Sequence, residues 1–415
     1  MSSFTDTAHL CFKPIRAGTR RAGNPMNNDP SNNVNRFDLP EWSGAFGDLG
    51  TLIPVVVAYI ALLGMNPNGL LVAFGLSLIA AGFIYRTPFP VQPMKAIGAS
   101  AVSQASLAAG LTASSVVGAA LMTGVIWLLL ASTGLAKRLS HHVPKSALLG
   151  VVMGLGFSFM GEGVRKMILA PYEALALFVL TLLMLNRPRV PSMLILLALG
   201  VGIAVVRNPQ LMTELQAIKA EFVIPSLAWQ DLTLHDLWVG LIFLALPQLP
   251  LTFGNAFISI TEENNRLFPK RPVNETTVAL STGVMNVFSS LIGGIPMCHG
   301  AGGMAGHIQF GARTGGSSII LGTVLLAVGV LLPSSVATLF KLFPGSVLGV
   351  ILFFAGLQLA LGGKDASGEK ADRFIVLGTA GIAVWNVGAG VLFGILAHHL
   401  AKRQWLRFRE SDSHK

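Results

Sequence analysis

The sequence predicts an all-α polytopic membrane protein of about fourteen transmembrane segments, arranged as two inverted repeats of seven. Three observations support this fold class. The 415 residues are 52% hydrophobic and only 12% charged, with a mean hydropathy of +0.65, whereas globular domains carry roughly 25% charged residues. Apolar segments near the spanning length of about 20 residues follow one another along the chain. The loops between them alternate between rich and poor in basic residues.

Fourteen apolar segments can be counted from the first to the last residue. The first seven are expected at about 42–64, 69–85, 90–108, 115–135, 146–162, 168–186 and 190–206. After a polar stretch, the second seven are expected at about 237–260, 275–293, 295–311, 316–333, 343–362, 373–386 and 387–401. The last two are short enough to be counted as one.

The distribution of basic residues supports this count. With the N-terminus inside, 23 Lys and Arg residues fall on the inner side, five fall in outer loops, and Lys95 alone lies within the membrane. This bias predicts that both ends are cytoplasmic in a plasma-membrane protein. The expected parts are a flexible tail at 1–40, a first repeat at 41–206, an extracytoplasmic connector at 207–236, a second repeat at 237–402 and a tail at 403–415. The first tail lacks the apolar core of a signal peptide, although its arginines leave an organellar targeting peptide open.

The third segment is interrupted where it should lie in the bilayer. Pro88, Pro90 and Pro93 hold the chain extended, and the residues after Pro93 can start a helix. Extended backbone at that depth is tolerated only where protein buries it or where it lines an aqueous cavity. The N-terminus of the half-helix would present unpaired N–H groups and a partial positive charge, to which Lys95 adds a full charge. This stretch therefore predicts an anion site.

The second half of the chain is interrupted at corresponding positions. Its third segment contains a Gly- and Pro-rich run at 293–307, and the first segment of each half is interrupted by Gly and Pro, at 44–54 and at 247–255. An odd number of spans per half forces the halves into opposite orientations, and paired interrupted segments mark a midplane substrate site in inverted-repeat transporters.

The polar residues of these segments each have a functional and a structural interpretation. Lys95 at mid-membrane costs about 2.5–3.5 kcal/mol on insertion scales, and it compensates the charge of a substrate, pairs with Asp48 or snorkels to the inner surface. Asp48 would bind a coupling proton or sodium ion, or serve as the structural partner of Lys95. Gln92 and Gln248 either donate to an oxyanion or cap carbonyl groups of the broken helices.

The tenth segment offers backbone groups and two histidines. Gly300, Ala301 and Gly302 would let a ligand approach the backbone, although glycine also packs membrane helices closely. His299 would donate to substrate or carry a proton. Cys298 and His307 lie near it, but no carboxylate or further Cys joins them in the sequence, so we expect no metal site. Glu162 with Arg165 and Lys166 is expected to form an interfacial ion pair.

Several function classes are not supported. The sequence contains no catalytic constellation and no phosphate-cradling loop, so we expect neither an enzyme nor direct ATP-driven transport, and no cofactor. The net charge of +10 comes from loops and tails rather than from one basic face, which argues against nucleic-acid binding. Cys11 and Cys298 cannot make a disulfide framework.

Two stretches resemble the signature motifs of the molybdate transporter type 1 family, a branch related to the sulfate permeases. The first runs from 41 to 51 with Pro54 and contains Gly47, Asp48, Gly50 and Thr51. The second runs from 90 to 96 and contains Gln92, Met94 and Lys95. The resemblance implies a uracil-permease-like fold with a core of spans 1–4 and 8–11 and a gate of spans 5–7 and 12–14. It also implies that spans 3 and 10 each begin as a short strand and continue as a half-helix. About a dozen residues follow the last span, so the C-terminal STAS domain of larger sulfate permeases is expected to be absent.

The resemblance implies a carrier for a tetrahedral oxyanion, molybdate, working by alternating access. The expected substrate-binding residues are Gln92, Met94, Lys95, Gln248, His299, Gly300, Ala301 and Gly302. Sulfate is the nearest alternative substrate, and an uncoupled anion channel is the alternative class. Two negative charges moving inward oppose a negative-inside potential, so we expect a co-transported cation, in the first place the proton. The oligomeric state is open, with a homodimer as one option.

Overall fold

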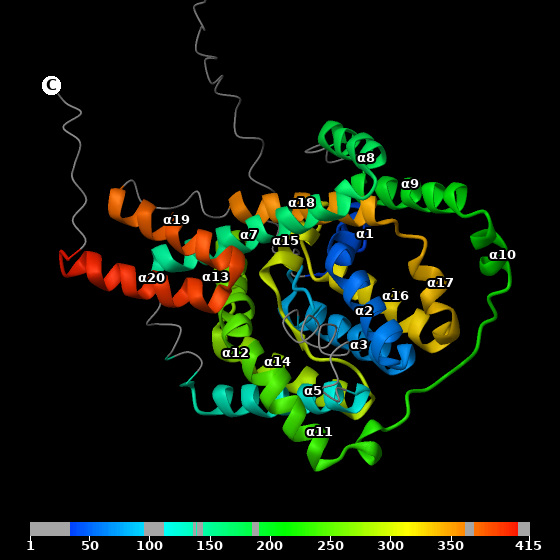
Figure 1. The fold of residues 1–415 in the computed structure, drawn as a ribbon, viewed down its shortest axis with the longest axis horizontal. Helices are drawn as coiled ribbons and strands as arrows, with labels where there is room; N and C mark the ends of the chain where they lie inside the picture. The colour runs from blue at the N-terminus through cyan, green and yellow to red at the C-terminus, as the bar shows by residue number, and fades with distance from the viewer. Residues whose placement is uncertain are drawn as a thin grey trace, which may run out of the picture. The chain divides into compact units, whose positions relative to one another are not determined.

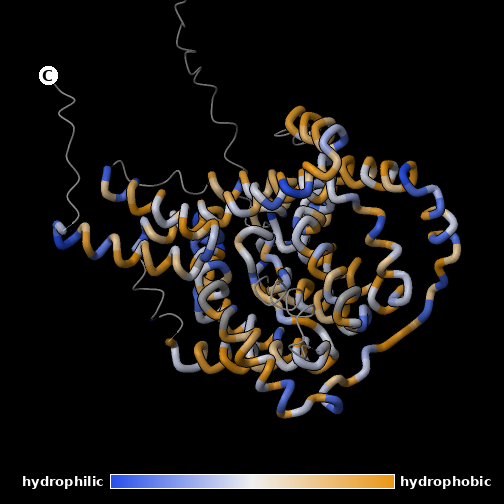
Figure 2. The backbone as a smooth tube through the Cα atoms, viewed as in Figure 1, coloured by the Kyte–Doolittle hydropathy of each residue, from blue (hydrophilic) through white to orange (hydrophobic). Residues whose placement is uncertain are grey.

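The computed structural model describes residues 34–94, 112–135, 138, 144–184, 191–361 and 369–405. Within these ranges the chain is almost entirely helical, with one antiparallel pair of very short strands (Figure 1). Hydrophobic residues follow one another along the helices, and hydrophilic residues gather at several helix ends (Figure 2). Many large apolar side chains are exposed, among them Leu183 and Leu392, as expected of helices that face lipid.

The first half contains eight helical elements and one strand among its described residues. These are α1 (Leu39–Ala45), the 3₁₀ turn η1 (Phe46–Asp48), α2 (Leu49–Leu63), α3 (Pro67–Tyr85), β1 (Gln92–Pro93), α5 (Ala113–Ser132), α7 (Lys145–Ile168), α8 (Pro171–Met184) and α9 (Ser192–Arg207). The region predicted as the connector contains α10 (Gln210–Gln216) and the 3₁₀ turn η2 (Ala228–Asp231).

The second half repeats this order. Its first span comprises α11 (Leu234–Val239), the π-helical η3 (Gly240–Ala245), α12 (Leu246–Thr252), the π-helical η4 (Phe253–Ser259) and α13 (Ile260–Leu267). The later elements are α14 (Glu275–Leu291), β2 (Met297–Cys298), α15 (Ala301–Gln309), α16 (Gly316–Leu331), η5 (Pro333–Ser335), α17 (Val336–Phe340), α18 (Gly345–Ala360), α19 (Lys370–Trp385) and α20 (Val387–Lys402).

The predicted spans coincide with these elements. Every predicted segment except the third and the tenth matches a helix or a run of helices. The tenth comprises β2 and α15, and the third contributes β1 before the described residues stop at Met94. Four of the described helices are each long and apolar enough to cross a membrane, with α1 to α2 counted as one. The number rises to six if two sharply bent pairs, α9 with α10 and α16 with α17, count as spans. The other spans are shorter apolar helices or broken segments.

The first spans of the two halves are interrupted differently. Span 1 changes from α1 through the 3₁₀ turn η1 into α2, as its Gly-rich motif predicts. Span 8 stays helical through Pro247 and Pro250, with a π-helical segment on either side of α12. Proline lacks the backbone N–H of a regular helix, and its ring clashes with the preceding turn. A π-helical turn inserts one extra residue into the helical repeat, which lets the helix continue past the prolines. The predicted break at 247–255 is therefore a distortion rather than an interruption.

Helix pairs from opposite halves pack at their glycines. α3 packs on α16, and a Cβ on Gly75 would lie 2.7 Å from the carbonyl oxygen of Gly322. α7 packs on α18, and a Cβ on Gly156 would lie 2.6 Å from the carbonyl oxygen of Gly356. α14 packs on α5 in the same manner as α16 on α3, since each pair joins the second span of one half to the fourth span of the other. This equivalence is what an inverted repeat predicts.

A buried carboxylate fastens the beginning of the first span to α16. Glu41 is fully buried, and its oxygens accept the backbone N–H groups of Arg313 at 2.8 Å, Thr314 at 2.9 Å and Ser317 at 3.1 Å. A carboxylate at a helix N-terminus satisfies orphan donors and complements the helix dipole. Glu41 therefore joins the two halves at the beginning of the first span.

Candidate functional site

The two broken segments meet as a two-stranded antiparallel sheet. β1 pairs with β2 in the register Gln92 opposite Cys298 and Pro93 opposite Met297, and the N–H of Met94 donates to the carbonyl of Pro296 at 3.0 Å. Asn286 of α14 braces β2, because its side chain donates to the carbonyl of Met297 at 2.6 Å and accepts from the N–H of Met297 at 2.8 Å. The sheet places residues from opposite halves at one buried point, as the paired breaks predict.

The half-helix α15 begins directly after β2 and carries no side-chain cap. Its N-cap residue Gly300 is extended, with φ −95° and ψ 130°, and as a glycine it has no side chain to cap the helix; the N–H of Gly303 donates to the carbonyl of Gly300 at 3.0 Å. Ala301, Gly302 and Gly303 are all buried. The first N–H groups of a helix have no intrahelical acceptor and carry the positive end of its dipole. This helix end is therefore a buried site that favours an anion.

Two glycines allow polar side chains to reach this helix end. A Cβ on Gly300 would overlap the side-chain oxygen of Gln92, and a Cβ on Gly303 would lie 2.8 Å from Oδ2 of Asp48. Glycine at these positions therefore lets residues of span 1 and of β1 contact the first turn of α15. The side chain of Asn255 in η4 also lies near this helix end, because a Cβ on Gly300 would be 3.4 Å from its Nδ2.

Asp48, Thr51 and Gln92 form one buried hydrogen-bond network. Nε2 of Gln92 donates to Oδ1 of Asp48 at 2.5 Å and to Oγ1 of Thr51 at 3.0 Å. The hydroxyl of Thr51 donates to the backbone carbonyl of Asp48 at 3.0 Å and also to its Oδ1. The oxygen of the Gln92 amide is buried and has no hydrogen-bond partner among the described residues. The Gln92 side chain thus bonds to Asp48 through its nitrogen, while its oxygen lies next to Gly300 at the N-terminus of α15.

Span 8 contributes a second polar pair. Nε2 of Gln248 donates to Oγ1 of Thr252 at 2.9 Å, and this hydroxyl contacts the sulfur of Met94 at 4.0 Å. Gln248 and Met94 are thus linked through Thr252, which was not among the residues predicted for the site. All three side chains are buried.

The two histidines are held by backbone and hydroxyl groups. Nδ1 of His299 bonds to the carbonyl of Pro90 and Nε2 to the hydroxyl of Ser281, both at 2.8 Å, and its ring lies edge-on to Tyr85. Both ring nitrogens of His299 are therefore bonded to groups of the protein. Nδ1 of His307 bonds to the carbonyl of Gly44 at 2.8 Å. In the described part of the chain no cluster of His, Cys, Asp and Glu could hold a metal ion.

The known relatives of this sequence decide the family. The model described as "Molybdate transporter of MFS superfamily" matches residues 40–159 and 240–359, two ranges of equal length, one in each half. This chain belongs to the molybdate transporter family. It is 33% identical to Molybdate transporter 2 of Arabidopsis thaliana over 404 residues, covering 85% of each chain. It is 29% identical to Molybdate transporter 1 of the same plant over 418 residues, covering 89% of each.

Solved structures confirm the fold of this molybdate transporter family member. The transmembrane domain of the cyanobacterial bicarbonate transporter BicA aligns with a TM-score of 0.52 at 17% identity, covering 87% of this chain and 98% of that one. The murine anion transporter Slc26a9 in its inward-facing state aligns with a TM-score of 0.58 at 13% identity, covering 92% and 71%. The predicted family and the polytopic inverted-repeat fold are thus confirmed, and the chain is a membrane transporter rather than an enzyme.

The family's signature residues divide into those that surround the site and those that pack the helices. Asp48, Thr51, Gln92 and Met94 lie around β1, whereas Lys95 and the residues up to 111 lie outside the described residues. Gly47 lies against the backbone of Gly306 in α15, and Gly50 lies against α18. Thr252 and Asn255 could have been predicted from the sequence, because both belong to the segment 247–255, which contains two prolines and a glycine.

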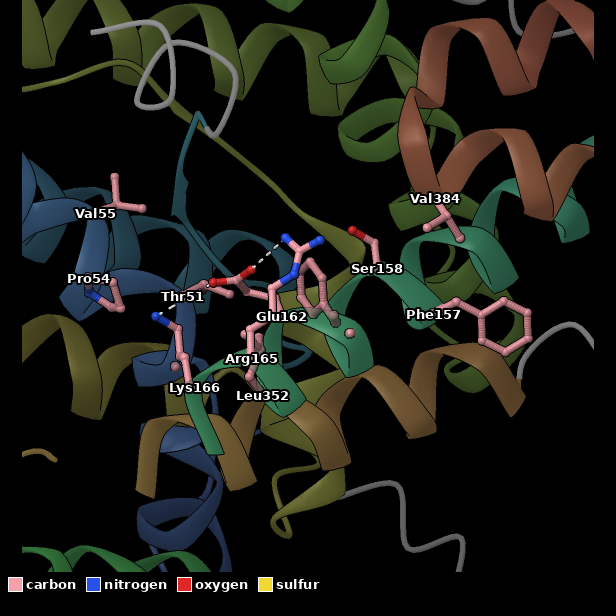
Figure 3. Close-up of a pocket in the computed structure, with 13 residues that line it drawn as sticks. Thr51, Pro54, Val55, Phe157, Ser158, Glu162, Arg165, Lys166, Leu352 and Val384 are labelled. Atoms are coloured by element: carbon pink, nitrogen blue, oxygen red, sulfur yellow. Dashed lines mark ion pairs between the residues drawn. The ribbon is translucent and has the colours of Figure 1, made fainter. Parts of the chain in front are cut away.

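A cavity of about 310 Å³ opens beside the network. Thr51 and Pro54 of α2 line it, as do Glu162 and Lys166 of α7 (Figure 3). Phe159 of α7 also lines it. Leu352 of α18 and Val384 of α19 complete the wall. The cavity therefore lies between span 1, which belongs to the expected core, and spans 5, 12 and 13, which belong to the expected gate.

Proposed function

We propose that the protein is a secondary transporter that takes up molybdate across the plasma membrane, with both termini in the cytoplasm. The observation that carries the proposal is the buried, uncapped N-terminus of α15 next to the β1–β2 pair. A helix N-terminus with free N–H groups binds tetrahedral oxyanions without further charge. The choice of molybdate among such anions rests on the relatives, two of which are molybdate transporters of Arabidopsis thaliana.

In this proposal the oxyanion accepts hydrogen bonds from the first turn of α15. The ring of Phe159 lies against Gly302 and would have to move to admit the anion, and the amide groups of Gln92 and Asn255 lie at the same helix end. Lys95 follows β1 after one residue, and its positive charge would act from the half-helix that the sequence predicts after Pro93. A dianion would thus be bound between donors of both halves, as in other transporters built from inverted repeats.

We propose that Asp48 carries a co-transported proton. Two unit charges 4 Å apart in a protein interact by about 4 kcal/mol at an effective dielectric constant of 20. An ionised Asp48 next to the first turn of α15 would therefore oppose a dianion, and binding would favour its protonated form. A protonated carboxyl group can donate to the Gln92 amide oxygen, and the reversed amide then directs its N–H groups toward Gly300.

Transport would proceed by alternating access. The core of spans 1–4 and 8–11 carries the site, and the gate of spans 5–7 and 12–14 packs against it through α7 and α18. Movement of one body against the other would expose the N-terminus of α15 to each side in turn.

The test is molybdate uptake into liposomes that contain the purified protein. We expect saturable uptake, stimulated by an inward proton gradient, with counterflow from preloaded vesicles and weak competition by excess sulfate. Asp48→Asn should abolish the stimulation by the gradient while binding persists, and Asp231→Asn, on the exposed turn η2, is the matched control. Equal competition by sulfate would make the protein a general sulfate-class carrier, and uptake without saturation or counterflow would indicate a channel. Uptake insensitive to pH and ionophores would refute proton coupling.

A further inference from the structure

The cavity beside Thr51 joins the proposed anion site to a group of charged residues. It is lined by Thr51, which bonds to both Asp48 and Gln92. It is also lined by Glu162, Arg165 and Lys166, in the last two turns of α7 (Figure 3). The charge bias of the sequence places this end of α7 on the outer side of the membrane. The cavity therefore extends from the predicted outer side toward the site.

The charged group carries an excess of positive charge. Glu162 is paired with Arg165 at 3.6 Å and with Lys166 at 3.7 Å, so one carboxylate serves two cations. Both distances exceed the usual 2.7–2.9 Å of a charge-assisted hydrogen bond. By contrast, Lys341 pairs with Glu214 at 2.8 Å and Arg207 with Glu173 at 2.7 Å, one cation to one carboxylate. Basic residues in a last turn also complement the helix dipole, but the dipole does not require them to line a cavity.

An aromatic side chain closes the inner end. Phe159 is 6% exposed, lines the cavity, and places its ring directly on Gly302, so that a Cβ on Gly302 would overlap the ring. Phe159 belongs to span 5 of the expected gate, whereas Gly302 belongs to the half-helix of the expected core. A ring at this contact separates the cavity from the first turn of α15, and movement between gate and core would displace it.

We infer that this cavity is the outer access path of the transported oxyanion. Arg165 and Lys166 attract and select anions at its mouth, and Phe159 is the barrier at its inner end. The inference rests on the proposed function, because it assigns the route to that same site. Charges of one sign at the mouth of a cleft with low-dielectric walls raise the local concentration of an oppositely charged substrate and its association rate.

The charge selection is tested with the double variant Arg165→Gln/Lys166→Gln in the liposome assay. At sub-saturating molybdate and low salt, initial uptake should fall roughly tenfold, within the range that steering provides, with the saturated rate little changed. The difference should shrink when salt is raised from about 0.01 M to about 0.15 M, because the Debye length falls from about 30 Å to about 8 Å. Glu162→Gln should act in the opposite direction and raise uptake at low salt.

The matched control is Lys341→Gln. Lys341 is a half-exposed basic residue on the same predicted side, paired with Glu214, and it does not line the cavity. Uptake by the Lys341→Gln variant should equal that of the wild type at both salt concentrations. A double variant that also equals the wild type at both concentrations overturns the access path and leaves the proposed function intact. A folded wild type that neither binds nor transports molybdate refutes the proposed function itself.

The barrier is tested with Phe159→Ala and Phe159→Leu. Removal of the ring should connect the cavity to the site, so that Phe159→Ala adds a non-saturable anion leak to the saturable uptake. Phe159→Leu keeps an apolar side chain over Gly302 and should leak less, and it keeps the test available if the alanine variant fails to fold. Monodisperse, thermally stable variants with wild-type saturation and no leak would show that Phe159 is not the barrier.

Discussion

Substitution of Gly303 by alanine tests whether the close approach of Asp48 and Gln92 to α15 forms the binding site. A Cβ at Gly303 would lie 2.8 Å from Oδ2 of Asp48, 2.8 Å from Cβ of Pro90 and 3.0 Å from Cδ of Gln92. Carbon atoms in real proteins essentially never approach this closely, and Pro90 is held rigidly by its ring. Either the first turn of α15 or the Asp48–Gln92 network must therefore move.

The magnitude follows from the cost of overpacking. An extra methyl group in a well-packed interior costs about 1–3 kcal/mol, and about 1.4 kcal/mol corresponds to tenfold in affinity. If the site bears the whole distortion, molybdate binding weakens by about 5- to 150-fold. Gly381→Ala in α19 is the matched control, because it has no other residue's atom within 4 Å of its Cβ position. Both changes replace glycine within a helix, so both gain about 1 kcal/mol of helix propensity.

The assay is calorimetry of molybdate binding to purified protein in detergent, accompanied by thermal unfolding of each variant. Gly303→Ala should lose affinity, whereas Gly381→Ala should bind like the wild type and unfold at the same or a higher temperature. Unchanged affinity in a folded Gly303→Ala variant would refute the placement of the site at this contact.

Three further predictions concern other parts of the site and its support. Lys95→Ala should weaken molybdate binding without preventing membrane insertion, and unchanged affinity in the folded variant would contradict a role in charge compensation. Glu41→Gln should lower the free energy of unfolding by about 1.5–3 kcal/mol, because the amide nitrogen cannot accept the N–H of Ser317; Glu275→Gln in the first turn of α14 is the control. Asn286→Ala removes both hydrogen bonds to Met297, so unfolding should be easier by about 1–3 kcal/mol for each group left unpaired and molybdate binding should weaken. Calorimetry that shows wild-type affinity for Asn286→Ala would mean that β2 does not position the site.

The sequence predicts the spans well because hydropathy is a local property. A helix in lipid must satisfy its own backbone and present apolar side chains over its whole length, which leaves a clear pattern. The broken third and tenth spans are also visible locally, since the prolines and glycines around Pro93 and Gly300 exclude a continuous helix. Span 8 shows the limit of this reasoning, because the same residue types at 247–255 are accommodated there by π-helical turns.

The sequence by itself determined that this chain is a polytopic inverted-repeat protein, and its motifs identified the family; the anion site at the paired breaks is its prediction. Only the tertiary structure decided which groups meet there. It placed the Gln92 amide between Asp48 and Gly300, directed His299 toward Ser281, and set Phe159 on Gly302. The physical reason is that periodicity and composition describe each segment and its solvent, whereas these contacts join segments of opposite halves. Such contacts depend on how closely the glycines let the helices approach.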